Sequence, residues 1–264
     1  MPGSLDASPF AGTAAYYDRF RAPYAPAAFD FIAAAYDLSP AVRALDLGCG
    51  PGTIAIPLSH RVAEVLAVDP DADMIAEGRR LAALRGGRNI DWCHSRAEHI
   101  SLEAGPFRVA TLGQSFHWMD RDQVLRKLAL LQSDGGGLAL VNGGRRRPQE
   151  SWEPLAQKIV EKFLGPRLRH PKANPQEPRH EPALLRSHHF SEFTCHEFPG
   201  TITRDIGSII GCIYSISSSS RPLFGNDAGA FETALTQALL SVNPTGLFNE
   251  HVETEVLLAP RRAA

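Results

Sequence analysis

The sequence predicts an α/β fold built on a parallel sheet. Short apolar runs alternate with helical patterns through residues 41–142, as they do in βαβ units with right-handed crossovers. A glycine-rich turn at residues 45–53 follows the first apolar run, and Asp69 ends the second. Because ligands of open α/β sheets bind at the carboxyl ends of the strands, we expect a binding site at these two positions.

The first half of the chain carries this alternation. Residues 27–37 are rich in alanine and predict a helix that stops before Pro40, since the residue before a proline disfavours helical geometry. Strands are expected at residues 42–47, 65–68, 90–94, 107–113 and 137–141, with helices at 54–60, 71–84 and 124–131. Apolar runs that stop at glycine or at Asp-Pro are typical of strands buried on both faces.

The second half is less regular. Helices are expected at residues 152–163, 205–214 and 227–241, and strands at 190–203 and 252–259. A Pro-rich basic stretch at 166–182 is expected to be a lid or surface loop. The serine run at 217–220 is also expected to be a loop.

Composition excludes several classes of protein. The 264 residues include 27 basic and 29 acidic side chains, a net charge of −2, which argues against a nucleic-acid coat protein or a polybasic membrane binder. No apolar run approaches the roughly 20 residues of a membrane span, and the N-terminus does not resemble a secretory signal. The four cysteines are scattered without a CxxC pair. We therefore expect a cytoplasmic protein with reduced thiols, without nucleic-acid or membrane partners.

The glycine-rich turn reads LDLGCGPGT and contains the pattern Asp46-x-Gly48-x-Gly50-x-Gly52. Glycines at alternate positions let the backbone bend tightly and let a ligand lie directly on it. Thr53 stands where dinucleotide enzymes have their third glycine, so the turn favours a ligand without a pyrophosphate. A carboxylate at Asp69 can accept hydrogen bonds from ribose hydroxyls in either ligand class. A nicotinamide-dependent oxidoreductase therefore stays open as a less favoured alternative.

The motif LDLGCGPGT followed by VLAVDPDADM resembles the class I S-adenosylmethionine-dependent methyltransferases. The segments RAEHI and GQSFHWMD resemble their small-molecule branch, which includes trans-aconitate methyltransferase-like and natural-product enzymes. The resemblance implies a Rossmann-like, seven-stranded, mostly parallel sheet with an antiparallel last strand and a helical substrate-capping insertion. It also implies one methyltransferase domain over residues 1–264. In that domain, 1–40 form N-terminal cap helices, 41–142 the cofactor-binding core, and 143–264 the capping insertions and the last two strands.

The same resemblance implies S-adenosylmethionine as the cofactor and assigns residues to it. The methionine side of the cofactor would lie on the loop formed by Asp46, Gly48, Gly50 and Gly52, with Gln114 under the methionine moiety. The ribose would be held by Asp69, adenine would pack against Pro70 and Met74, and the adenine edge would be flanked by Ala97 and Glu98. The cofactor would be covered by Tyr17 and Arg21, with Tyr24 nearby. Arg96 stands where many members have an acidic or small polar residue.

His117 is the candidate catalytic base, because it follows the fourth expected strand and a histidine there can titrate near neutrality. The alternative is that His117 and Trp118 form a packed wall beside the cofactor. The other histidines weighed are His170, His180, His188, His189 and His196, and their spacing matches no common zinc pattern. No metal site is therefore expected.

Substrate contacts are less defined. Arg145–Arg147 could steer an anionic substrate or form a solvated loop, and Tyr214, Ser215, Ser217 and Arg221 could face a substrate chamber or belong to an ordinary loop. The sequence thus predicts methyl transfer to a small organic molecule, a specialised metabolite. A protein that binds the cofactor without methylating, such as a cyclisation catalyst, is the main alternative. A homo-oligomer is also compatible with the sequence.

Overall fold

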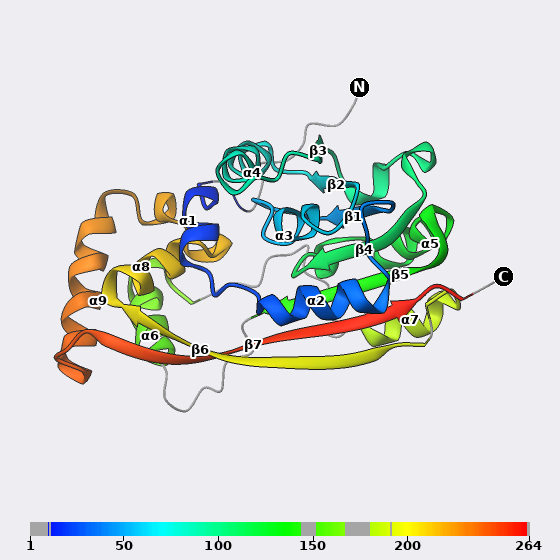
Figure 1. Ribbon diagram of the computed structural model, residues 1–264. Coiled ribbons are helices and arrows are strands. Elements are labelled where there is room, and N and C mark those ends of the chain that lie inside the picture. Colours follow the sequence, from blue (N-terminus) through cyan, green and yellow to red (C-terminus); the bar gives the residue numbers. More distant parts are fainter. Residues whose placement is uncertain (1–9, 11, 144–151, 167–179, 191, 263–264) are drawn as a thin grey trace, which may run out of the picture. The chain divides into compact units, whose positions relative to one another are not determined.

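The computed structural model of the chain describes residues 10, 12–143, 152–166, 180–190 and 192–262 (Figure 1). It divides the chain into two compact units. The sheet unit consists of Tyr24–Gly143, Pro171–Phe198 and Thr254–Ala264, and the helical unit of Met1–Pro23, Gly144–His170 and Pro199–Glu253. Arg145–Arg147 and His170, singled out above, lie outside the described residues.

The sheet unit follows the expected alternation. Its elements are α2 (Pro26–Ala35), β1 (Arg43–Leu47), α3 (Ala55–Ser59), β2 (Glu64–Asp69), α4 (Ala72–Arg85), β3 (Ile90–His94), β4 (Phe107–Gly113), α5 (Arg121–Leu131), β5 (Gln132–Gly143) and α7 (Glu181–Ser187). β6 (Thr194–Asp205) and β7 (Leu247–Pro260) run through both units. Each strand that we expected between residues 42 and 141 is therefore confirmed, with β5 longer than predicted.

Among the described residues the strands form one seven-stranded sheet in the order β3-β2-β1-β4-β5-β7-β6. β1 to β5 pair in parallel, and β7 pairs antiparallel with β5, for example Leu140 with Leu257. The expected antiparallel last strand is thus confirmed. Since the strand order reverses beside β1 and β4, the carboxyl ends of these two strands border the crevice in which such sheets bind ligands.

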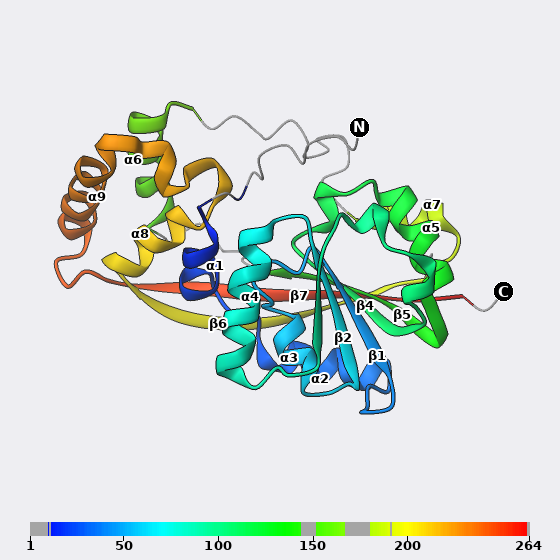
Figure 2. The same ribbon diagram turned by 90° about the horizontal axis from the view of Figure 1, so that it is seen from above.

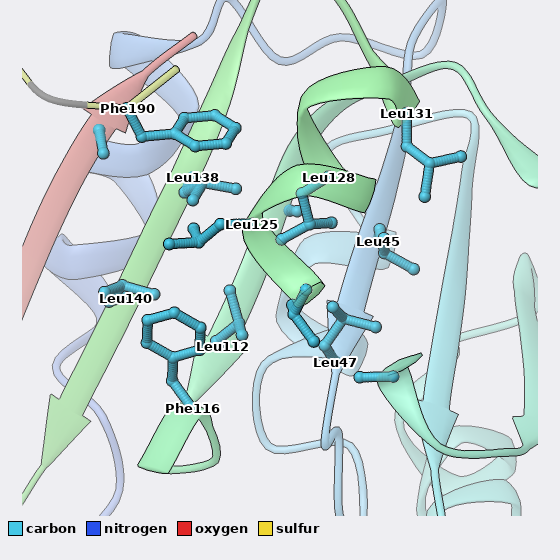
Figure 3. Close-up of a cluster of buried hydrophobic side chains, with 14 of the residues drawn as sticks. Leu45, Leu47, Leu112, Phe116, Leu125, Leu128, Leu131, Leu138, Leu140 and Phe190 are labelled. Carbon is cyan, nitrogen blue, oxygen red and sulfur yellow. The ribbon is translucent and has the colours of Figure 1, made fainter. Parts of the chain in front are cut away.

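Both faces of the parallel sheet are covered by helices (Figure 2). On one face, apolar side chains of α2, α3 and α4 pack on Ala44 and Ala67. On the other face, α5 covers Leu45 and Leu47, as Figure 3 shows for Leu125 and Leu128. Burial on both sides explains why β2 and β4 are largely apolar runs.

α4 is capped at both ends. The Asp71 side chain accepts hydrogen bonds from the backbone amides of Asp73 and Met74, at 2.9 and 3.1 Å. Gly86 ends the helix in a left-handed conformation, with φ of 79°. An aspartate cap contributes about 1 kcal/mol, and here it also fixes where α4 starts after Asp69.

The loop expected at residues 166–182 is wrong for residues 181 and 182, which begin α7. Pro182 lies in the first turn of this helix, where its missing N–H costs no hydrogen bond. Ala183 and Leu184 are fully buried in the cluster that contains Leu125 and Phe190. The burial of two apolar side chains thus outweighs the loop-forming composition around them.

The helical unit contains α1 (Ala14–Phe20), α6 (Glu153–Leu164), α8 (Ile206–Tyr214) and α9 (Ala228–Val242). Its core is aromatic and includes Trp152, Tyr214, Phe224 and Phe231. α1 packs on α8 without a gap, because a Cβ on Gly211 would lie 2.4 Å from the ring of Phe20. None of the helices in the described part of the chain combines the length and the apolar character of a membrane span.

A buried ion pair joins the elements of the helical unit. The guanidinium of Arg204 on β6 contacts the carboxylate of Glu250 on β7, and the two side chains are only 4% and 1% exposed. Arg204 also donates to the carbonyl of Phe20 at 2.8 Å, and the Trp152 indole donates to Glu250 at 3.2 Å. Two strands, α1 and the start of α6 therefore meet at one charged pair.

Candidate functional site

The glycine turn connects β1 to α3 and has an unusual backbone. Gly48, Gly50 and Gly52 have φ values of +63°, +52° and +84°, a region that other residues rarely adopt. The amides of Gly48 and Cys49 donate to the carbonyl of Val68 at 2.8 and 3.1 Å, which ties the turn to the end of β2.

The three glycines border different surroundings. A Cβ on Gly48 would lie 2.4 Å from the Cβ of Ser115, and one on Gly52 would lie 2.7 Å from the Trp92 ring. A Cβ on Gly50 would meet no atom within 4 Å. Gly48 and Gly52 are therefore closed in by protein, whereas the backbone at Gly50 faces open space in which a ligand can lie.

Asp69 stands beside this open position. One carboxylate oxygen accepts from the amide of Gly50 and the other from the amide of Asp71, both at 2.8 Å. A carboxylate has about four lone-pair sites, so Asp69 keeps acceptor capacity for a ligand. Burial raises the pKa of Asp69 to about 6, while its two amide donors and His94 act in the opposite direction.

Asp46 lies deeper, at the end of β1. It is 1% exposed, and its Oδ1 accepts from the hydroxyl of Thr111 at 2.8 Å. Its Oδ2 is buried and makes no hydrogen bond to the described residues. Burial raises the pKa of Asp46 to about 7, against the effect of Thr111 and of the Ala55 amide, while the nearby charge of Asp69 raises it further. A donor brought by a ligand would stabilise the ionised form of Asp46.

The residues predicted to contact adenine differ in their burial and in their partners. Met74 is buried at 2% exposure on α4, and Pro70 is exposed. Ala97 is buried in the apolar cluster beneath α5. The carboxylate of Glu98 accepts from the Asp120 amide at 2.9 Å, and is thereby turned toward the start of α5.

Gln114 follows β4 in a left-handed conformation, with φ of 49°. Its backbone amide donates to the Val141 carbonyl at 3.0 Å, and its side-chain amide donates to the Gly143 carbonyl at 2.9 Å. The chain therefore turns sharply at Gln114 and is anchored to the end of β5. This turn leads directly into the segment with His117.

His117 lies in a short 3-10 helix, Phe116–Trp118, at this same sheet edge. The segment packs on the glycine turn, since Ser115 donates from its hydroxyl to the Leu47 carbonyl at 2.6 Å. Burial, followed by the charge of Arg121, lowers the pKa of His117. A half-buried, neutral imidazole can accept a proton at neutral pH.

Two predicted cofactor residues, Tyr17 and Arg21, belong to the helical unit. The Arg21 guanidinium lies over the Tyr17 ring, 4.6 Å from its centroid, and donates to the hydroxyl and carbonyl of Ser215 at 2.9 and 3.0 Å. Tyr214 is buried and donates from its hydroxyl to Glu232 at 2.9 Å. Tyr214 and Ser215 thus take part in the packing of the helical unit.

Sequence reasoning missed Trp92. The indole of this β3 residue touches the Gly52 position, as described above, and would lie 2.4 Å from a Cβ on Gly78 of α4. Trp92 therefore fills the space between the glycine turn and α4. The signal was available in principle, because a bulky aromatic residue often faces a glycine inside a helix.

The comparison with protein families matches residues 44–136 to a model described as a methyltransferase domain. Among known proteins, the chain is 32% identical over 136 residues to an uncharacterised methyltransferase of Mycobacterium bovis, a match that covers 50% of this chain and 51% of the relative. The chain therefore spans about half the length of this relative. A stretch of 62 residues is 40% identical to a 23S rRNA (uracil(1939)-C(5))-methyltransferase of Klebsiella pneumoniae, covering 24% of this chain and 14% of that protein.

Among solved structures, the chain is similar to a protein described as a type II methyltransferase from Anaeromyxobacter dehalogenans. The TM-score is 0.63 at 21% identity, and the match covers 92% of this chain and 98% of the other. At this identity the likeness is one of fold, and it includes the elements of both units.

Proposed function

We propose that this chain is a class I S-adenosylmethionine-dependent methyltransferase, which the match of residues 44–136 to a methyltransferase domain supports, and that it methylates a small organic molecule. The observation that carries the proposal is the open face of Gly50 beside the Asp69 carboxylate. This arrangement offers a backbone surface and a hydrogen-bond acceptor for ribose hydroxyls. The sequence has no phosphate-binding GxxxxGK[ST] motif.

The residues present fit S-adenosylmethionine. A side chain at Gly50 would occupy the open space on the turn, whereas glycine leaves it free. Asp69 has acceptor capacity left for ribose hydroxyls, and Asp46 has a buried oxygen without a described partner. Met74 is an apolar residue in the first turn of α4, the helix that begins after Asp69, and we assign it to the adenine side. We assign the turn to the methionine side of the cofactor and Asp69 to the ribose.

When bound, S-adenosylmethionine supplies a methyl group on a positively charged sulfonium, which a nucleophile can displace in line. The chain contributes mainly by positioning, since holding two reactants in the reactive geometry can lower the barrier by about 7–11 kcal/mol. The turn at residues 114–119 and the glycine turn are packed on each other through Ser115. A group bound beside His117 is thereby held in a fixed relation to the backbone at Gly50.

A small acceptor is favoured over RNA by charge. The net charge is −2, whereas RNA binding draws on a broad field of lysine and arginine. The similarity to the rRNA enzyme covers only a quarter of the chain. We propose a specialised metabolite as acceptor and a cytoplasmic location, in line with four free cysteines.

The test starts with calorimetric titration of the protein with S-adenosylmethionine and S-adenosylhomocysteine. We expect binding at one site, lost in Asp69→Ala and kept in the matched control Asp91→Ala, whose side chain lies exposed on β3. Radiolabelled methyl transfer is then followed with a small-molecule cell extract and with ribosomal RNA. No binding of either compound would reject the cofactor, label on RNA alone would reject the small acceptor, and binding without any product would favour a non-methylating role.

A further inference from the structure

A second histidine lies near His117 in the sheet unit. His180 precedes α7, and its ring packs on Phe116 with the centroids 5.4 Å apart. The guanidinium of Arg121 lies near the same Phe116 ring, with its carbon 5.5 Å from the centroid. Phe116 is 1% exposed and Arg121 is 5% exposed. Two polar side chains, His180 and Arg121, thus pack on one buried ring beside His117.

The imidazole of His180 has unused hydrogen-bonding capacity. Its Nδ1 is buried and makes no hydrogen bond to the described residues. Buried polar atoms in native proteins nearly always have a partner, and an exception calls for a functional or structural explanation. A bound ligand with an O–H group would supply the donor that Nδ1 lacks.

Burial, and after it the charge of Arg121, keeps the imidazole of His180 neutral. Burial, Arg121 and His117 lower the pKa of His180 to about 4, and Glu181 and Glu255 oppose them. The same guanidinium lowers the pKa of His117. At neutral pH both rings therefore carry a free lone pair, and each can accept a hydrogen bond or a proton.

His117 lies just past the carboxyl end of β4, at the sheet edge where ligands of such folds bind. Glu255 lies on β7 opposite Asn142 of β5, and the Asn142 amide donates to Glu255 at 3.0 Å. Because the His180 ring packs on Phe116, which belongs to the same segment as His117, both histidines lie next to the carboxyl end of β4.

We propose that His117 and His180 together form the binding site for the acceptor's hydroxyl group, so that the methylated atom is oxygen. This inference rests on the function proposed above. One imidazole nitrogen accepts the O–H hydrogen bond. A lone pair of the acceptor oxygen would form the O–CH3 bond while the S–CH3 bond of the cofactor breaks and leaves its electron pair on sulfur, which would release S-adenosylhomocysteine. The O–H proton would move to the imidazole nitrogen, and the electron pair of the O–H bond would stay on oxygen. The imidazolium then returns the proton to solvent.

The experiment measures binding of 2-naphthol, with its methyl ether 2-methoxynaphthalene as the matched probe that has no O–H group. Protein saturated with S-adenosylhomocysteine is titrated with each probe by fluorescence. We expect the naphthol to bind at least about fivefold more tightly, because one added hydrogen bond has roughly this effect on affinity. We expect this preference for naphthol to vanish in His180→Phe, which keeps an aromatic ring on Phe116. In His180→Gln the preference should fall about twofold or more.

His189→Phe is the control variant, because His189 lies exposed beyond the other end of α7. It should keep the wild-type preference for naphthol. Equal binding of the two probes to the wild type, or an unchanged preference in both His180 variants, would overturn the proposal. Calorimetry with S-adenosylhomocysteine is run on each variant first. Failure of the wild type to bind it would refute the proposed function, whereas intact binding without the naphthol preference would refute only this inference.

Discussion

In the sheet unit, strands that follow one another in the chain mostly lie side by side, and the site is formed largely by backbone geometry at their ends. The helical unit instead gathers three distant stretches, 1–23, 144–170 and 199–253. It is held together by aromatic side chains and by the Arg204–Glu250 pair. Backbone geometry leaves a motif in the sequence, whereas side chains assembled from distant stretches do not. The contrast predicts that removing one buried charge destabilises the helical unit. It also predicts that adding one methyl group to a glycine of the turn destabilises the sheet unit.

The largest effect is expected for Arg204→Met. It leaves the buried carboxylate of Glu250 without its guanidinium, and breaking a buried pair costs about 3–5 kcal/mol of unfolding free energy. Urea denaturation measures this cost. The control is Arg262→Met, because Arg262 and Glu192 are 54% and 73% exposed and such a pair contributes about 0–1 kcal/mol. Similar losses in both variants would mean that the helical unit does not depend on its buried pair.

The glycine turn offers the complementary test in the sheet unit. Gly48→Ala should lower stability by about 2–4 kcal/mol, because it combines a left-handed φ with overlap of Ser115. The added methyl group of Gly50→Ala meets no neighbouring atom. This variant should therefore lose only about 1–2 kcal/mol of unfolding free energy, because alanine disfavours the left-handed backbone conformation.

Cofactor affinity should separate the two glycines further. Gly50→Ala places its methyl group in the open space and should weaken S-adenosylhomocysteine binding at least about tenfold, or 1.4 kcal/mol. Calorimetry and urea denaturation on the same samples distinguish the two effects. Normal affinity in Gly50→Ala would contradict the position that we assign to the cofactor.

A third prediction concerns pH. In the free protein the pKa values of Asp46 and Asp69 are raised to about 7 and about 6, so both carboxyls take up protons as the pH falls through this window. Donors on the cofactor favour the ionised forms, so binding should release protons, and affinity should rise with pH by up to about tenfold per unit for one proton. Calorimetry in two buffers of different ionisation enthalpy counts the protons.

Thr111→Val sharpens this pH measurement. It removes the hydroxyl that donates to Asp46, so the pKa of Asp46 should rise further and the pH dependence should shift upward. An affinity that is independent of pH between about 5.5 and 8 would show that neither carboxyl changes its ionisation on binding.

The smallest effect is expected for Trp92→Phe. The shorter ring loses contact with the Gly52 and Gly78 positions, so the glycine turn is less firmly supported. We expect a two- to fivefold loss of cofactor affinity, corresponding to roughly 0.4–1 kcal/mol. If Trp92 contacts the turn as described, cofactor binding should also change the fluorescence of the wild type more than that of the variant.

Most of the sheet unit could be predicted from its sequence, because β1, β2 and β4 are short, largely apolar runs that stop at glycine or Asp-Pro. The left-handed glycines of the turn and the acid at the end of β2 were found for the same reason. α7 was missed because burial of Ala183 and Leu184 depends on α5, a partner more than fifty residues earlier in the chain. The His180 position beside Phe116 was missed for this reason too. The assignments of Tyr17, Arg21 and the adenine residues stay predictions from resemblance.

Asp69 has a consequence for any attempt to redesign the specificity of this domain. Its carboxylate closes the glycine turn through the Gly50 amide and is also the proposed sugar contact. An engineer who exchanged this acid to admit a different nucleoside would at the same time release the backbone on which that nucleoside has to lie. Evolution toward another cofactor would therefore have to alter the acid and the turn together.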